Sequence, residues 1–377
     1  MKKIRVMFVM IQLDVGGSER VVFDLAKNLN PDRFEVYVAA FNPGVLEFSL
    51  RKVCKEVFFI HKKNGFDLSA MRQLSRILDE NDIEVINAHH YMPLFYSFLG
   101  AKVLNRKKLV FTEHSVPEVE GIASSIHGKV LHWLLFSIDK VVGVSVQITD
   151  SFRQYYPRHA EKFISVMNGI DVNSYNAKSR RDDIRHNFGF SQDHFVIGTI
   201  ANFRKVKNHS CLIRACAILK DSHPQLRLIF VGTSFPGDPD NSEEAIRREI
   251  SELGIQNMVV MPGYQSNIAE LLSAFDAFCL PSFSEGLPVS VLEAMSAGVP
   301  VIGSQVRGIV ELVKNRETGL LFNSEDDKDL SCKIEEIIKN PALRKEISAN
   351  AHDYVTKNHD IQSWVQQYAE IFGCTKQ

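Results

Sequence analysis

The stretch Phe275–Pro300, FDAFCLPSFSEGLPVSVLEAMSAGVP, decides the fold of this chain because it passes from the pattern of a strand to that of a helix. Phe275–Leu280 is an apolar run of the kind found in buried strands. After a polar loop, apolar residues recur with helical spacing from Pro288 to Gly298. The stretch therefore predicts strand, loop and helix. The helix would start at the carboxyl end of the strand, where open α/β sheets bind ligands.

Two acidic residues bracket the start of this helix. Glu285 lies in the loop and Glu293 in the helix, roughly 7 Å further along the axis than Pro288 at about 1.5 Å per residue. Free N–H groups at a helix start attract phosphate. A sugar nucleotide could thus offer its sugar to Glu285 and its ribose to Glu293. Alternatively, each glutamate is a solvated residue, but the combination with Gly286 and Pro288 favours a ligand site.

The motif EGLPVSVLE at 285–293, followed by AMSAGVPVI, resembles the signature of retaining glycosyltransferases of family 4, which have the GT-B fold. The resemblance implies an α/β protein with two Rossmann-like, doubly wound parallel-sheet domains facing a central cleft. It places Glu285 beside the donor sugar and Glu293 on the ribose hydroxyls. It also assigns Gly286, Leu287 and Pro288 to the donor site.

Composition agrees with a two-domain globular protein. The chain has 377 residues, 45% hydrophobic and 24% charged, and a net charge of −1 that gives no reason to expect nucleic acid. Its six cysteines lack C-x-x-C spacing, which is typical of reduced thiols in a reducing compartment. No apolar run approaches the length of a membrane span. We therefore expect a cytoplasmic protein.

The charge is unevenly distributed. Residues 1–170 carry 22 Lys and Arg against 18 Asp and Glu, and the acidic excess lies in the remainder. A basic N-terminal half would suit an anionic membrane surface or a phosphate-bearing acceptor. The stretch Ile122–Ile138, which contains Trp133, fits either an amphipathic helix facing acceptor or membrane or a core helix. Peripheral association with the inner face of the membrane through the N-terminal domain thus stays an open expectation.

The N-terminal half alternates between strand and helix patterns, which predicts a parallel doubly wound sheet. The expected strands are Ile4–Met10, Phe34–Phe41, Val57–Ile60, Glu84–Ala88, Leu109–Thr112 and Val141–Val144, and the expected helices Val21–Leu29, Leu68–Glu80 and Ser145–Tyr155. The motif VMNGID at 166–171 resembles the family segment that closes the first domain. We therefore place the N-terminal, acceptor-binding domain at 1–170 and the C-terminal, donor-binding domain at 171–360. A final helix within 361–377 is expected to pack back on the first domain.

Three short motifs of the first domain point to a site. Gly16 and Gly17 form a strand-to-helix turn that lacks the spacing of a dinucleotide site but resembles the family's GG-x-E loop, which lies against the donor diphosphate. FTEHS resembles the family's T-x-H-S, whose histidine lies beside the donor sugar, so we assign His114 to the active site. A structural histidine is the alternative. The adjacent His89 and His90 suggest a metal, but neighbouring side chains diverge and no acid follows at ligand spacing, so we expect none.

The second domain opens with a strand at Phe195–Ile200, followed by ANFRKVKN. The family has G-R-L here, and a lysine five residues after the arginine, and these two cations hold the diphosphate. Lys207 matches that lysine, whereas Asn202 stands at the arginine position, so Arg204 would have to supply the second charge. A solvated loop is the alternative. Asp238 and Asp240 form a D-x-D pattern in a Gly/Pro-rich stretch, which we interpret as a turn.

The sequence therefore predicts a retaining glycosyltransferase that moves a sugar from a nucleotide-diphosphate sugar, expected to be a UDP-sugar, to a saccharide or lipid-linked acceptor hydroxyl. Cell-surface polysaccharide or glycolipid biosynthesis is the expected process. The predicted catalytic residues are His114, Glu285, Lys207 and Arg204, and the predicted donor-binding residues Gly16, Gly17, Asn202, Gly286, Leu287, Pro288 and Glu293. No cofactor or metal is expected. The rival hypotheses are a nucleotide-sugar epimerase of the same fold and a non-catalytic sugar-nucleotide-binding subunit.

Overall fold

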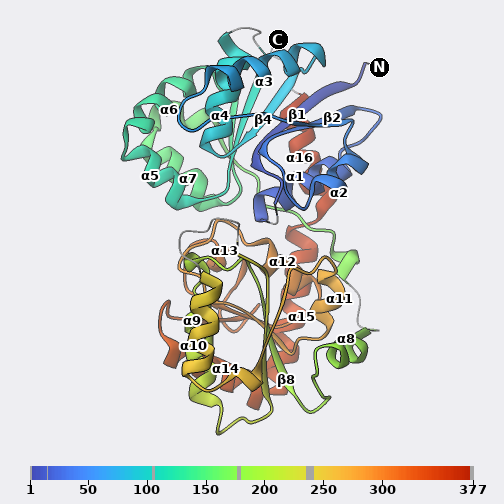
Figure 1. Cartoon of the computed structure of the whole chain (residues 1–377), viewed down its shortest axis with the longest axis vertical. Coiled ribbons are helices and arrows are strands. Elements are labelled where there is room, and N and C mark those ends of the chain that lie inside the picture. Colours follow the sequence, from blue (N-terminus) through green and yellow to red (C-terminus); the bar gives the residue numbers. More distant parts are fainter. Residues whose placement is uncertain (1, 15, 104–106, 176–179, 235–241, 374–377) are drawn as a thin grey trace. The chain divides into compact units, whose positions relative to one another are not determined.

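The computed structural model describes residues 2–14, 16–103, 107–175, 180–234 and 242–373. The chain divides into two compact units (Figure 1). Unit 1 comprises Met1–Gly169 and Ile361–Gln377, and unit 2 comprises Ile170–Asp360. The predicted D-x-D turn at Asp238 and Asp240 lies outside the described residues.

Unit 1 is built on a seven-stranded, all-parallel sheet in the order β3-β2-β1-β4-β5-β6-β7. Its strands are β1 (Ile4–Gln12), β2 (Phe34–Asn42), β3 (Glu56–Phe59), β4 (Val85–His89), β5 (Lys108–Glu113), β6 (Lys140–Gly143) and β7 (Phe163–Ser165). Its helices are α1 (Gly17–Asn28), α2 (Glu47–Val53), α3 (Leu68–Glu80), α4 (Tyr91–Phe98), the π-helix η1 (Leu99–Val103), α5 (Val116–Ala123), α6 (Ile126–Ser137), α7 (Val146–Tyr155), the 3-10 segment η2 (Pro157–Lys162) and α16 (Ile361–Gly373).

The C-terminal helix α16 completes the core of unit 1, beside β1 and α1 (Figure 1). Trp364, Tyr368 and Phe372 are almost fully buried. The ring of Phe372 packs edge-on against Phe8 of β1, with the centroids 6.0 Å apart. Burying such aromatic side chains gives about 1.5–3 kcal/mol each, which explains why the chain returns to unit 1 at its end.

Unit 2 has a six-stranded, all-parallel sheet in the order β10-β9-β8-β11-β12-β13. Its strands are β8 (Phe195–Ile200), β9 (Leu226–Val231), β10 (Val259–Gly263), β11 (Ala277–Leu280), β12 (Val301–Ser304) and β13 (Leu320–Phe322). Its helices are η3 (Val172–Tyr175), α8 (Arg181–Asn187), η5 (Lys205–Lys207), α9 (His209–Leu219), α10 (Ser242–Glu252), η6 (Gln256–Met258), α11 (Ile268–Ser273), α12 (Val289–Ser296), α13 (Ile309–Leu312), α14 (Asp327–Lys339) and α15 (Pro341–Asn358). The prediction of two Rossmann-like parallel sheets is thus confirmed.

Two local expectations differ from the structure. The apolar pattern over Ile122–Ile138 is split between α5 and α6, because the Ser125 hydroxyl accepts a bond from the His127 N–H at 3.1 Å and starts a new helix. Helix α12 begins at Val289, one residue later than expected, with Pro288 as its N-cap in an extended conformation. No described helix has both the length and the hydropathy that a membrane span needs.

Candidate active site

The second sheet brings together the two loops that the sequence singled out. β8 and β11 are neighbours, although β9 and β10 separate them in the chain. Strand order reverses at this point, and loops leaving the carboxyl ends of such strands form the ligand crevice of open α/β sheets. Across the two loops, the Phe283 N–H donates to the Val206 carbonyl at 2.8 Å. The fold of unit 2 therefore places both candidate loops at one switch point.

Lys207 and Glu285 form an ion pair at this switch point. The ammonium of Lys207 lies 2.7 Å from Glu285 Oε1 and 2.9 Å from Oε2, and the Ser282 hydroxyl donates to Oε1 at 2.6 Å. The two side chains are only 21% and 8% exposed. The structure thus brings together the predicted phosphate-binding cation and the predicted sugar-binding acid. Both charges are held in fixed positions before any ligand arrives.

Arg204 and Asn202 do not join this pair. Arg204 is exposed, and its guanidinium makes no hydrogen bond or ion pair within the described residues. The buried amide oxygen of Asn202 likewise has no hydrogen-bond partner there. Arg204 was predicted to replace the family arginine at position 202. No contact of its guanidinium among the described residues supports that role.

The loop between β11 and α12 is packed tightly against Gly308. Gly308 has a φ of +82°, and a Cβ at this position would lie 2.5 Å from the carbonyl oxygen of Gly286 and 2.6 Å from that of Glu285. Only glycine fits here without displacing the loop. Helix α12 starts directly after it with no side chain capping its first N–H groups. Gly286 and Pro288 thus lead into a helix start that can accept an anion.

Glu293 lies inside α12 and is 6% exposed. Its Oε1 accepts a hydrogen bond from the Tyr175 hydroxyl at 2.9 Å. Tyr175 ends η3, near the start of unit 2. The aromatic hydroxyl orients the carboxylate predicted to bind ribose. A tyrosine in an otherwise polar stretch was the one available signal for it.

The first sheet has its own switch point, between β1 and β4. Gly16 is the N-cap of α1 and Gly17 is its first residue, after the short loop that follows β1. A Cβ on Gly16 would lie 2.4 Å from the carboxylate of Glu19, so the glycine leaves room for this acid. The Ser18 hydroxyl donates to Glu19 Oε2 at 2.8 Å. Burial raises the pKa of Glu19, and the charge of His90 opposes this rise. Glu19, in the first turn of the helix that begins at the glycines, therefore lies near His90, the residue after β4.

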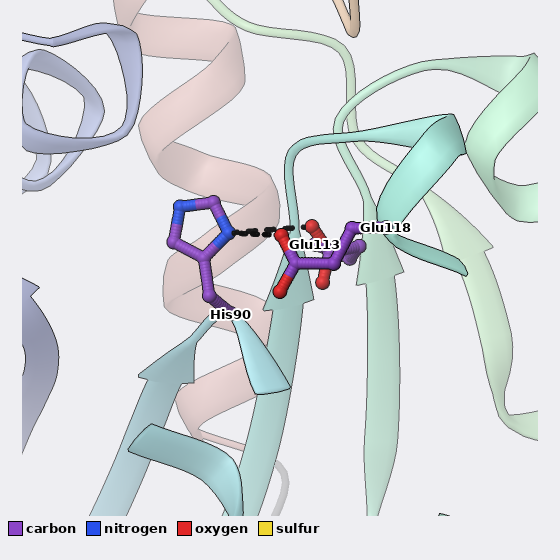
Figure 2. Close-up of side chains that lie close together, drawn as sticks. All are labelled: His90, Glu113 and Glu118. Carbon is purple, nitrogen blue, oxygen red and sulfur yellow. Dashed lines mark hydrogen bonds and ion pairs between the residues drawn. The ribbon is translucent and has the colours of Figure 1, made fainter. Parts of the chain in front are cut away.

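His90 holds two carboxylates at the end of β4 (Figure 2). Its Nδ1 lies 3.0 Å from Glu118 Oε2 and 3.4 Å from Glu113 Oε1. Burial alone would lower the pKa of His90, but the hydrogen bonds and charges of Glu113 and Glu118 raise it well above its usual range. Burial raises the pKa of Glu113 to about 7. His90 is therefore a cation between two acids, in a strained backbone conformation with φ of +69°.

These three residues are also the described group whose ligand atoms could hold a metal ion, since they lie within 4.8 Å of one another. The sequence argument missed both acids because Glu113 ends the neighbouring strand β5 and Glu118 lies in α5, far from His90 in the chain. Histidine and carboxylate are ligands that Zn²⁺ accepts. In this structure, however, both carboxylates contact the same ring atom, His90 Nδ1, so one N–H of the imidazole serves both acids. The second oxygen of Glu113, Oε2, is buried and has no hydrogen-bond partner among the described residues.

His114 follows β5 and lies against the other two histidines. Its Nε2 is 2.8 Å from His89 Nδ1, and its ring stacks on His89 with centroids 5.0 Å apart. The ring of His90 lies 5.1 Å away. The predicted residue thus belongs to a group of three histidines at the switch point of unit 1. Sequence reasoning missed Asn87 and Glu113, which lie beneath this group in buried strands, where polar side chains are the only local signal.

Comparison with known proteins places these features in a family. The model described as Glycosyltransferase Family 4 matches residues 15–174, and the one described as Glycosyl transferases group 1 matches residues 180–354. The N-acetyl-alpha-D-glucosaminyl L-malate synthase of Bacillus anthracis is 25% identical over 95% of this chain and 94% of its own length. The Escherichia coli UDP-Gal:alpha-D-GlcNAc-diphosphoundecaprenol alpha-1,3-galactosyltransferase is 20% identical over 98% and 97%.

Solved structures support the fold over the same length. Anabaena Alr3699/HepE, in complex with UDP and glucose, has a TM-score of 0.88 at 24% identity and covers 99% of this chain and 100% of its own. WaaG, a glycosyltransferase involved in lipopolysaccharide biosynthesis, has a TM-score of 0.79 at 17% identity, over 98% and 100%. The predicted GT-B fold is confirmed. The chain belongs to the family 4 glycosyltransferases, enzymes that transfer a sugar from a nucleotide sugar.

Proposed function

We propose that this protein is a retaining glycosyltransferase that moves a sugar from a UDP-sugar to a hydroxyl of a saccharide or lipid-linked acceptor. The observation that carries the proposal is the Lys207–Glu285 ion pair at the switch point of unit 2. Its geometry offers a cation to a diphosphate and an acid to a polyhydroxyl ring. The HepE structures contain UDP or UDP-glucose, which supports a UDP-sugar donor.

The proposed roles follow the chemistry of the leaving group. The bond between the anomeric carbon and the diphosphate oxygen breaks, and the acceptor oxygen bonds to the same face of that carbon. The acceptor proton passes to the departing phosphate oxygen, so no enzymic nucleophile is needed. Lys207 and the start of α12 stabilise the charge on the diphosphate. Glu285 binds the sugar, and Glu293, oriented by Tyr175, binds the ribose.

Unit 1 supplies the remaining proposed contacts. Gly16 and Gly17 contribute backbone N–H groups toward phosphate, and His114 contributes its imidazole to the donor sugar. Acceptor binding is assigned to the same unit. The Escherichia coli relative is named for an acceptor linked to undecaprenol diphosphate, which supports a lipid-linked acceptor and a role in cell-surface polysaccharide or glycolipid biosynthesis.

The test is transfer from a panel of UDP-sugars, preceded by thermal denaturation with each donor, because a bound ligand raises the stability of the folded state. A UDP-sugar that stabilises the protein should also be consumed when acceptor is present. Nuclear magnetic resonance of the product should show the anomeric configuration of the donor. Inversion would contradict the retaining mechanism.

One observation favours a second candidate, a non-catalytic sugar-nucleotide-binding subunit. Asn202 occupies the arginine position of the family, and exposed Arg204 has no partner in the described part of the chain. A single cation would then face the diphosphate. The same experiment separates the two functions, since stabilisation by a donor without hydrolysis or transfer to any acceptor would favour the binding subunit.

A membrane surface is the proposed location of unit 1. Ile126, Trp133 and Phe136 lie on one side of α6 and are 67%, 74% and 58% exposed. Lys129 is exposed one turn before Trp133, and the Lys162 ammonium binds the last carbonyls of the helix at 2.6–3.0 Å. Exposed aromatic residues beside cations are suited to an anionic lipid interface.

This location can be tested by sedimentation with phosphatidylglycerol vesicles, with phosphatidylcholine vesicles for comparison. The double variant Trp133→Ala/Phe136→Ala should lose at least 10-fold in binding to the anionic vesicles. Phe48→Ala is the matched control, because Phe48 is 70% exposed on α2, away from this helix. Equal losses in the two proteins would contradict docking through α6.

A further inference from the structure

A buried hydrogen-bonded chain of polar side chains leads to His114, and the proposed reaction does not use it. The Asn87 amide nitrogen donates to Thr112 Oγ1 at 2.9 Å and lies 3.4 Å from the Val110 carbonyl oxygen. Its amide oxygen is 3.1 Å from His89 Nε2, and His89 Nδ1 is 2.8 Å from His114 Nε2. Asn87, His89 and Thr112 are all 0% exposed. Thr112, Asn87 and His89 thus form a buried hydrogen-bonded chain that ends on the His114 imidazole through His89.

The donors and acceptors along this hydrogen-bonded chain can be assigned. The Val110 carbonyl can only accept a hydrogen bond, so the nitrogen of the Asn87 amide must face it and the oxygen must face His89. That oxygen also only accepts, which requires the proton of His89 to be on Nε2. The Nδ1 of neutral His89 is then an acceptor, and His114 must donate to it from Nε2. In neutral His114 the lone pair is therefore on Nδ1.

The neighbouring cluster keeps both imidazoles neutral. His90 holds Glu113 and Glu118, and neither His89 nor His114 has a carboxylate within hydrogen-bonding distance in the described residues. Burial, followed by the charge of His90, lowers the pKa of His89 well below its usual range. Burial, followed by the neighbouring histidines, does the same to the pKa of His114. These directions favour a charged His90 beside a neutral His89 and a neutral His114.

We propose that Asn87 and His89 are positioning residues that hold His114 in its Nε2-protonated neutral form, so that its free Nδ1 accepts a hydrogen bond from a hydroxyl of the donor sugar. No partner for Nδ1 is present among the described residues. A lone pair repels phosphate oxygens, so a neutral hydroxyl is the ligand group that this form of His114 can bind. The identity of the ligand rests on the proposed function, whereas the tautomer does not.

The tautomer can be measured without any activity. In protein labelled with ¹⁵N-histidine, long-range ¹H–¹⁵N correlation at pH 7.5 should show His114 protonated at Nε2 only, with assignments from His114→Gln and His89→Gln. A His114 ring protonated at Nδ1, or at both nitrogens, would overturn the inference. This result holds whether or not the protein transfers sugar, so it separates the inference from the proposed function.

The role of Asn87 is tested with Asn87→Leu, which keeps the side-chain volume but cannot accept from His89. The second tautomer of His114 should then appear, and kcat/KM for transfer should fall about 10-fold. The melting temperature of Asn87→Leu should stay within a few degrees of that of His114→Gln. Thr112→Val is the control. It removes the hydroxyl that accepts from the Asn87 amide nitrogen but leaves the contact between Asn87 and His89, so His114 should keep the single tautomer. An unchanged tautomer in Asn87→Leu would show that Asn87 positions nothing.

Discussion

Removing the cation of the Lys207–Glu285 pair should affect rate more than donor affinity. In Lys207→Ala the Glu285 carboxylate, 8% exposed, would keep the Ser282 hydroxyl at 2.6 Å as its one side-chain partner among the described residues. Breaking a fully buried pair costs about 3–5 kcal/mol. Because Lys207 is 21% exposed and Ser282 remains, we expect a loss of about 2–3 kcal/mol in unfolding free energy.

The catalytic effect has a separate size and a separate measurement. Negative charge builds up on the diphosphate as the glycosidic bond breaks, so loss of a fixed cation should lower kcat by about 100- to 1000-fold, equivalent to about 3–4 kcal/mol. The dissociation constant of the donor should change less. On one protein preparation, steady-state kinetics measures kcat, donor titration measures the dissociation constant, and thermal denaturation measures the loss of stability.

Matched variants make this test sharp. Lys205→Ala removes the same charge from the same 3-10 turn, but Lys205 is exposed and forms no ion pair among the described residues, so its kinetics should stay near those of the native protein. Arg204→Ala should show a smaller rate loss than Lys207→Ala if Arg204 replaces the missing arginine. Glu285→Gln should bind UDP at least as tightly as the native protein, because a carboxylate that repels phosphate is gone. A fully active Lys207→Ala enzyme would refute the assignment of the diphosphate to this cation.

The remaining predictions concern nucleotide, metal and pH. Glu293→Gln should weaken UDP binding by about 1–3 kcal/mol in calorimetric titration, and Tyr175→Phe by less, because Tyr175 only orients the carboxylate. Transfer should survive excess chelator; a loss reversed by metal would place an ion at His90 with its two acids, or in the Asp238–Asp240 stretch. Burial, followed by the charge of Lys207, lowers the pKa of His209 to about 3. Because the unfolded chain binds a proton below about pH 6.5, stability should fall as pH decreases from there, by about 2 kcal/mol from this residue at pH 5. In denaturant titrations, His209→Phe should lose less unfolding free energy than the native protein between pH 7 and pH 5. An equal loss in the two proteins would contradict this assignment.

Elements with local start and stop signals could be predicted from the sequence. Helix α3 has the expected bounds, Leu68–Glu80, because Asp67 accepts from the Ser69 N–H at 2.8 Å and caps the first turn. The strand Phe195–Ile200 also has the expected bounds, since most of its side chains are apolar and buried. The break between α5 and α6 was missed because the apolar period continues across Ser125 while the cap depends on one hydroxyl.

The candidate sites were predictable as motifs but not as contacts. Lys207 and Glu285 are 78 positions apart in the chain, and Tyr175 and Glu293 are 118 apart. Each pair depends on which strands become neighbours and on the register of the loops that follow them, which no local pattern contains. The partner of a motif residue is therefore the part that requires the structure.

The two candidate sites share one electrostatic arrangement, in which cations are neutralised internally before a ligand binds. Lys207 is paired with Glu285, and His90 with Glu113 and Glu118. A diphosphate that approaches Lys207 must compete with the Glu285 carboxylate, so part of the attraction is offset in the ground state. The offset stays constant during bond cleavage, while the charge on the leaving phosphate grows. A cation shared with a fixed acid therefore binds the transition state more strongly than the donor, and only such a difference accelerates the chemical step.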